Sequence, residues 1–187
     1  MKLERSKLEA LHDGIVIPAH PLALNADRRL DEKHQRALTR YYMASGAGGV
    51  AVAVHSTQFE IRDPKHNLFE KVLQLAAEEV DRAKLDRPFL KVAGICGPTE
   101  QALKEVEVAL KYGYDAGLLS MGGLKDYSEA DLLERTKAVA ARMPVIGFYL
   151  QPSVGGRIFT YDFWSKFVEI DNVVAIKMAP FNRYQSL

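Results

Sequence analysis

The stretch PVIGFYLQPSVGGRIFTYDFWSKFVEIDNVVAIK, residues 144–177, holds two short apolar runs on either side of an amphipathic segment. PVIGFY (144–149) and NVVAIK (172–177) are rich in β-branched and aromatic residues, which is typical of buried strands. Between them, Thr160 precedes apolar residues spaced three and four apart, the spacing of one helix face. Because a strand, a helix and a second strand follow one another, this stretch predicts two neighbouring parallel strands joined by a helix.

The same alternation recurs along the whole chain. Four further apolar runs read as strands, and helical patterns separate most of them: GIVIP (14–18), GVAVAV (49–54), FLKVAGI (89–95) and AGLLS (116–120). One of these helices has a capping pattern, Ser128 followed by Asp131 three residues later. Strand starts recur at intervals close to the ~30 residues of one unit in an eight-stranded TIM barrel of typically ~250 residues. We therefore expect a single α/β domain over residues 1–187, a (β/α) barrel with about six of eight units and with units seven and eight missing.

Composition excludes several classes of function. The 25 basic and 24 acidic residues are balanced, with no basic stripe to bind nucleic acid. Cys96 is the single cysteine, which rules out an intrachain disulfide or a zinc–cysteine cluster. Nothing approaches the ~20 apolar residues of a membrane span. We expect a cytoplasmic protein with no cofactor and no metal, in which His20 and His55 are structural or substrate-lining residues because no helical His/Glu motif surrounds them.

Lys177 is the residue that most needs an explanation. It is a single ammonium group at the carboxyl end of the last apolar run, where barrel enzymes build their active sites. An amine attacks a carbonyl only when it is neutral, and at the ordinary lysine pKa of about 10.4 only about one in 10³ is neutral at pH 7. Burial can lower that pKa by up to about 3–5 units. Lys177 is thus a candidate nucleophile that forms an imine with a 2-oxo acid, or alternatively the partner of a carboxylate in a structural ion pair.

Other polar residues also follow predicted strands. Tyr149 ends the fifth apolar run, and its phenol could shuttle a proton if it and Lys177 both face the barrel interior. Ser56 and Thr57 follow the second run and could hold a substrate carboxylate through hydroxyl and backbone N–H groups. Gly155 and Gly156 are included as candidate substrate-binding residues. Each has a structural alternative: a core tyrosine, hydroxyls that cap a turn, and turn glycines.

These segments together resemble the dihydrodipicolinate synthase and N-acetylneuraminate lyase family of Schiff-base-forming barrel enzymes. NVVAIKMAP is similar to the family's sixth-strand motif, which places the imine-forming lysine at Lys177. FYLQPSVGG is similar to its fifth-strand motif, which places the proton-relay tyrosine at Tyr149, and VHSTQFE to the loop whose hydroxyl pair would be Ser56 and Thr57. The resemblance covers essentially the whole chain and implies a pyruvate-like 2-oxo acid substrate and a homo-oligomer.

Two positions depart from the pattern of the synthases. The loop SMGGLKDY has glycines where the synthases carry a second relay tyrosine, and Val154 stands where they carry an arginine for the aldehyde's carboxylate. These departures favour a divergent lyase or hydro-lyase that acts on another 2-oxo acid or its aldol adduct. The alternative is a non-catalytic barrel relative with a binding or regulatory role. A metal-assisted aldolase is disfavoured, since no convergent set of His and carboxylate ligands is evident.

Overall fold

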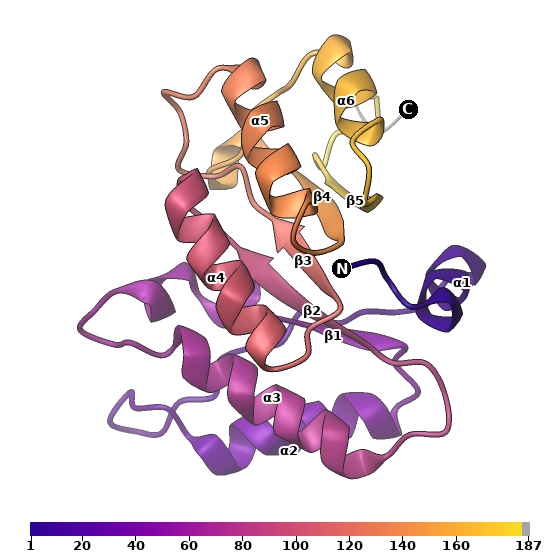
Figure 1. Cartoon of the computed structure of the whole chain (residues 1–187). Helices are drawn as coiled ribbons and strands as arrows, with labels where there is room; N and C mark the ends of the chain where they lie inside the picture. The colour runs from indigo at the N-terminus through magenta and orange to yellow at the C-terminus, as the bar shows by residue number, and fades with distance from the viewer. Residues whose placement is uncertain (185–187) are drawn as a thin grey trace. The chain divides into compact units, whose positions relative to one another are not determined.

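The computed structural model describes residues 1–184 of the chain (Figure 1). It divides into two compact units. The N-terminal unit comprises Leu3–Gly94 and Val108–Ala116, and the C-terminal unit comprises Met1–Lys2, Ile95–Glu107 and Gly117–Leu187. Both contain strands that alternate with helices along the sequence, as predicted. A single barrel domain over residues 1–187 stays a prediction.

The N-terminal unit is built on a buried parallel strand pair. β1 (Gly49–Val52) pairs with β2 (Leu90–Ile95), so that Gly49 lies opposite Leu90 and Val52 opposite Ala93. Every residue of both strands is buried, which matches their largely apolar sequences. The one charged residue, Lys91, is buried with its amine hydrogen-bonded to Asp81 at 2.8 Å. The remaining elements of this unit are α1 (Arg5–Asp13), α2 (Glu32–Ala44), two 3₁₀ turns (His55–Thr57 and Phe59–Arg62) and α3 (Phe69–Ala83).

The first predicted strand, residues 14–18, forms no ladder. The chain makes one isolated parallel bridge at this point, between Ala19 and Ala51. The Ala51 N–H donates to the carbonyl of Pro18 at 2.9 Å, but Pro18 has no backbone N–H and cannot donate a ladder hydrogen bond to β1. The prediction of a strand over residues 14–18 is therefore wrong: the segment runs beside β1 without regular pairing, and the described residues contain five strands instead of six.

The C-terminal unit continues the alternation. β3 (Ala116–Leu119) pairs in parallel with β4 (Val145–Leu150), and β4 pairs in parallel with β5 (Val173–Ala179). In both units, strands that are consecutive in the chain are therefore neighbours in the sheet. The other elements are α4 (Thr99–Lys111), which begins in this unit, α5 (Glu129–Ala140), a 3₁₀ turn (Pro152–Val154) and α6 (Tyr161–Val168).

Side-chain caps fix where α5 and α6 begin. Ser128 accepts a hydrogen bond from the Asp131 N–H at 3.1 Å, and the Asp131 carboxylate accepts one from the Ser128 N–H at 2.9 Å, which completes the predicted capping box. Thr160 caps α6 in the same way, accepting from the Phe163 N–H. Both helix starts predicted from the sequence are confirmed.

Aromatic side chains hold α6 against β4. Phe163 and Phe167 are fully buried, and Trp164 packs edge-on against both. Gly147 of β4 is required for this contact, because a Cβ there would lie 2.6 Å from the ring of Phe167. Since side chains alternate along a strand, the face of β4 that carries Gly147 is the face covered by α6.

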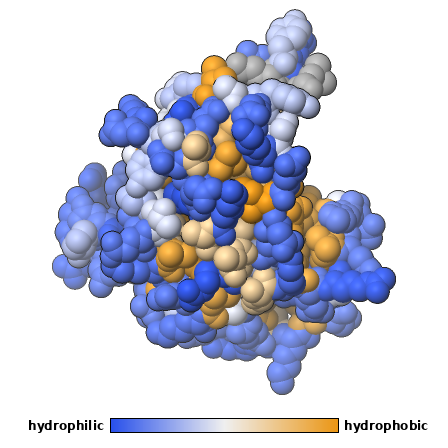
Figure 2. Space-filling view, turned by 45° about the horizontal axis from the view of Figure 1, so that its top comes forward, coloured by the Kyte–Doolittle hydropathy of each residue, from blue (hydrophilic) through white to orange (hydrophobic). Residues whose placement is uncertain are grey.

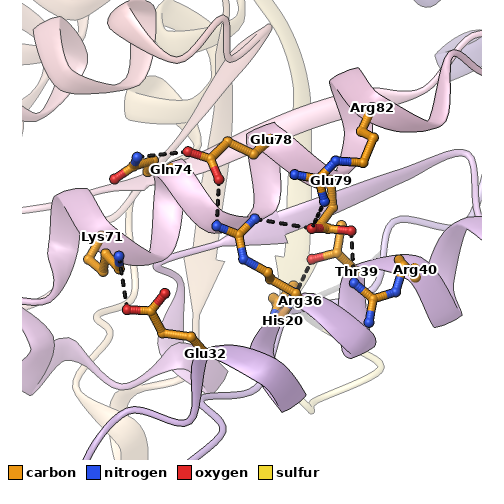
Figure 3. Close-up of polar contacts among 10 residues, drawn as sticks. All are labelled: His20, Glu32, Arg36, Thr39, Arg40, Lys71, Gln74, Glu78, Glu79 and Arg82. Atoms are coloured by element: carbon orange, nitrogen blue, oxygen red, sulfur yellow. Dashed lines mark hydrogen bonds and ion pairs between the residues drawn. The ribbon is translucent and has the colours of Figure 1, made fainter.

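A buried carboxylate joins α2 to α3 in the N-terminal unit (Figure 3). Glu79 of α3 is 2% exposed and bonds Arg36 at 3.1 Å, Arg40 at 2.8 Å and Arg82 at 2.6 Å. Burial by itself raises the pKa of Glu79, but hydrogen bonds and charge from the three guanidinium groups outweigh it and hold the pKa below its ordinary value. Charge-assisted bonds of this kind stabilise a buried ion only when its oxygens are satisfied, as they are here.

Figure 2 shows hydrophilic residues over much of the face it draws, with apolar residues visible between them. In the C-terminal unit, Val168 of α6 and Met178 of β5 are 56% and 48% exposed. Within residues 1–184, every helix is too short or too polar to cross a bilayer.

Replacing Phe167 by alanine is expected to lower the free energy of unfolding by about 3–5 kcal/mol, because it empties a fully buried site against Gly147. Tyr161→Ala is the matched control on the same helix, since Tyr161 is 89% exposed and should change the free energy by no more than about 0.5 kcal/mol. Urea denaturation of both variants measures the difference. Equal losses would contradict the packing described for α6.

Candidate active site

Lys177 lies near the carboxyl end of β5 and faces the side of the sheet opposite α6. Its cross-strand partner on β4 is Phe148, and its Nζ atom lies 4.9 Å from the centroid of the Phe148 ring. Gly147, the neighbour of Phe148, faces α6, so Phe148 and Lys177 share the other face. In a closed β/α barrel the face opposite the helices is the interior face, and an interior position for Lys177 stays a prediction.

The electrostatic setting of Lys177 differs from that of an ordinary surface lysine. Part of the side chain is exposed, yet burial of the amine lowers the pKa of Lys177 from its ordinary value. Among residues 1–184, no carboxylate forms an ion pair or hydrogen bond with it. The structural alternative, in which Lys177 is one half of an ion pair, therefore finds no partner in the described part of the chain.

Tyr149 does not share a face with Lys177 in this structure. It lies opposite Met178, and its ring packs 5.4 Å from the ring of Trp164 on α6. The expectation that the two side chains meet on the interior face is wrong because the register shifts by one residue between Val145 and Ile146. Without that shift, Tyr149 would lie opposite Lys177; with it, Phe148 takes that place, since a slip of one residue exchanges the two faces.

The two glycines after β4 shape a tight turn. Gly155 has a φ of 93°, a left-handed conformation that glycine adopts at low cost. A Cβ at Gly156 would lie 1.8 Å from the carbonyl oxygen of Leu150, so any side chain there would displace backbone. The turn accounts for both glycines without a ligand, and their role in substrate binding stays a prediction.

The hydroxyl pair Ser56 and Thr57 lies in the N-terminal unit, on the 3₁₀ turn after β1. Ser56 is exposed, whereas Thr57 is fully buried. The Thr57 hydroxyl donates to the carbonyl oxygen of His20 at 2.6 Å, so its one donor is already used in a hydrogen bond to the backbone. Of the two hydroxyls, only that of Ser56 is accessible to a bound molecule.

A buried network that the sequence did not reveal lies behind Thr57. The imidazole of His20 is fully buried between the hydroxyl of Thr39 (2.9 Å from Nε2) and the side-chain amide of Gln35 (2.8 Å from Nδ1). Desolvation lowers the pKa of His20, which favours the neutral ring. His20 is thus structural, one of the two roles expected for it, and it holds the backbone that Thr57 contacts.

Replacing Thr57 by valine is expected to cost about 1–3 kcal/mol of folding free energy, because the buried carbonyl of His20 loses its hydroxyl donor. Ser56→Ala is the control, with a change within about 0.5 kcal/mol for an exposed side chain. Thermal or urea unfolding separates the two. A Thr57→Val protein as stable as the parent would show that the hydroxyl is free to do something else.

Amine reactivity tests the electrostatics of Lys177. A labelling reagent reacts with the neutral amine only, so a lysine with a lower pKa begins to react at a lower pH. Lys166 of α6 is the internal reference, because its hydrogen bond to Asp162 raises its pKa. Competitive labelling followed by mass spectrometry should give Lys177 the lower midpoint. A midpoint for Lys177 at or above that of Lys166 would contradict its partial burial.

Known proteins support the fold and the resemblance. No family model matches the chain. The chain is 29% identical over 177 residues to the 4-hydroxy-tetrahydrodipicolinate synthases of two Bifidobacterium longum strains, an overlap of 92% of this chain and 55% of each enzyme. The chain resembles the dihydrodipicolinate synthase and N-acetylneuraminate lyase family. It spans about half the length of the curated relatives it matches.

Solved structures show the same fold. A dihydrodipicolinate synthase from Bacillus anthracis aligns with a TM-score of 0.77 at 19% identity, covering 92% of this chain and 57% of that structure. The N-acetylneuraminate lyase from Mycoplasma synoviae aligns with a TM-score of 0.72 at 16% identity, covering 91% and 56%. The predicted fold class is confirmed: the chain has the fold of part of a β/α barrel.

Proposed function

We propose that this protein is a lyase or hydro-lyase that acts on a 2-oxo acid such as pyruvate, or on its aldol adduct, through an imine at Lys177. The proposal extends to a class I aldolase mechanism without a metal or cofactor, and to a cytoplasmic homo-oligomer. The observation that carries it is the position of Lys177, near the carboxyl end of a barrel strand and without a carboxylate partner in residues 1–184. The similarity to the synthases and the lyases supports the substrate class.

The chemistry requires an amine that is neutral part of the time. The lone pair of the Lys177 Nζ attacks the 2-oxo carbon to give a carbinolamine. The carbinolamine takes up one proton from solvent and loses one water molecule, which leaves a protonated imine. That cation draws electrons from the neighbouring carbon, so that either a proton leaves carbon 3 to give an enamine or the adjacent carbon–carbon bond of an adduct breaks. Burial favours the first step, because it lowers the pKa of Lys177 and raises the share of neutral amine.

The remaining candidate residues take unequal parts in this proposal. Ser56 is the candidate contact for the substrate carboxylate, since its side chain is exposed while the Thr57 hydroxyl is committed to His20. Gly155 and Gly156 stay as candidates through their backbone groups. Tyr149 as the proton relay finds no support in the register, because its ring lies on the α6 face against Trp164.

A non-catalytic relative with a binding or regulatory role fits the glycines of SMGGLKDY, and it fits Val154, which is 44% exposed where the synthases carry an arginine. Such a protein could bind an oxo acid without forming a covalent bond. Trapping of a covalent adduct separates the two functions.

Incubation with pyruvate and a borohydride reductant should add the mass of a reduced pyruvyl group to the peptide that contains Lys177. The reductant converts the imine to a stable secondary amine, so the adduct survives digestion and mass spectrometry. Lys177→Arg keeps the charge but removes the nucleophile and should abolish labelling. Tyr149→Phe should leave labelling close to that of the parent, because its hydroxyl lies on the other face of the sheet.

Several 2-oxo acids of different chain length should be tried in the same way. An unmodified Lys177 peptide with all of them, in protein shown to be folded, would refute the imine and favour the binding role. Labelling of Lys166 in place of Lys177 would equally contradict the assignment.

A further inference from the structure

Phe148 and Lys177 form a cross-strand pair at the candidate site. They are register partners on β4 and β5, and the Lys177 Nζ lies 4.9 Å from the centroid of the Phe148 ring. An ammonium group within about 6 Å of a ring centroid is attracted by the negative face of the ring. Phe148 is 6% exposed, so the ring itself has little freedom to leave.

No other described group competes for the amine. Lys177 is the one titratable residue of β5, and Tyr149 is the one titratable residue of β4. Tyr149 faces α6, where it packs on Trp164, and the nearby charges of Asp162 and Lys166 on that helix pair with each other. Within residues 1–184, the ring of Phe148 is thus the one side chain seen in specific contact with the amine.

We infer that Phe148 is the positioning residue for Lys177: its ring holds the amine in place from one side without supplying a counter-charge. A carboxylate in the same place would also fix the amine, but it would keep it protonated and unreactive. A phenyl ring also favours the charged amine, but only weakly, by about 0.5–1 kcal/mol at exposed sites, so it opposes loss of the proton much less than a carboxylate does. The ring can therefore hold the amine in place while part of it stays neutral and reactive. An ion pair would hold the amine in place but keep it protonated.

This inference rests on the proposed function for its use in the reaction. The protonated imine carries its positive charge on the same nitrogen atom that now lies over the ring. The contact seen with the ammonium group therefore remains favourable after water has been lost and the imine has formed. Phe148 affects the reaction only by positioning the nitrogen of Lys177. Phe148 itself accepts no proton and no electron pair.

Two variants and one control test the role. Phe148→Leu keeps an apolar side chain but removes the ring, and Phe148→Tyr keeps the ring. Phe167→Leu is the matched control. Phe167 lies on α6, and its ring packs against the opposite face of β4 at Gly147, so this variant removes a ring without touching the Lys177 face. Circular dichroism and urea unfolding establish that each variant is folded before its chemistry is compared.

The first measurement needs no substrate. Protons held over the face of an aromatic ring resonate upfield, so the ε-methylene protons of Lys177 should be shifted upfield in the parent protein labelled with ¹³C-lysine. The shift should persist in Phe148→Tyr and Phe167→Leu and disappear in Phe148→Leu. No upfield shift in the parent, or one that survives in Phe148→Leu, would overturn the inference whether or not an imine forms.

The second measurement is the rate at which pyruvate is trapped on Lys177 at neutral pH. Phe148→Leu should slow trapping by roughly 2- to 5-fold, which is the range of about 0.5–1 kcal/mol for an exposed cation–π contact converted to a rate ratio, and Phe148→Tyr should stay close to the parent. An equal loss in Phe167→Leu would show that destabilisation, and not position, slows the reaction. If the ring shift is present but no oxo acid is trapped, the proposed function fails while the positioning of Lys177 stands.

Discussion

The pairing of β4 with β5 is the constraint on which the candidate site depends. Backbone hydrogen bonds fix Phe148 opposite Lys177, and the alternation of side chains then decides which residues share a face with the Lys177 amine. On the α6 face of β4, Tyr149 packs in the aromatic cluster of α6. On the other face, Phe148 contacts the amine of Lys177. A shift of one residue would exchange these two faces, so the register sets the chemistry that Lys177 can perform.

Local sequence signals predicted much of the fold. The five strands, the capping box at Ser128 and the Thr160 cap follow from residue type and spacing, because propensity and capping act within a few residues. The failure over residues 14–18 has an equally local cause, which is the missing N–H of Pro18. The family resemblance added the barrel, and structural similarity supports it for the part of the relatives that this chain spans.

The candidate site was less predictable, because it depends on contacts between distant residues. The expected alternation of faces holds for Lys177 and Ala175, but the register of β4 and β5 shifts by one residue beside Val145, and no pattern in the sequence marks that shift. The same limit applies to Thr57, because its hydroxyl donates a hydrogen bond to the backbone carbonyl of His20, 37 residues away, and the sequence does not show that contact. Lys177 could be proposed from the sequence because an isolated charge at the end of an apolar strand is visible without knowledge of its partners.

The most direct measurement of this account is a crystal structure of the protein after reduction with pyruvate. The account predicts electron density for a pyruvyl group joined to the Lys177 Nζ, beside the Phe148 ring, with the Tyr149 ring packed on Trp164. A structure in which Tyr149 lies beside the modified nitrogen and Phe148 packs against α6 would contradict the register and the site built on it.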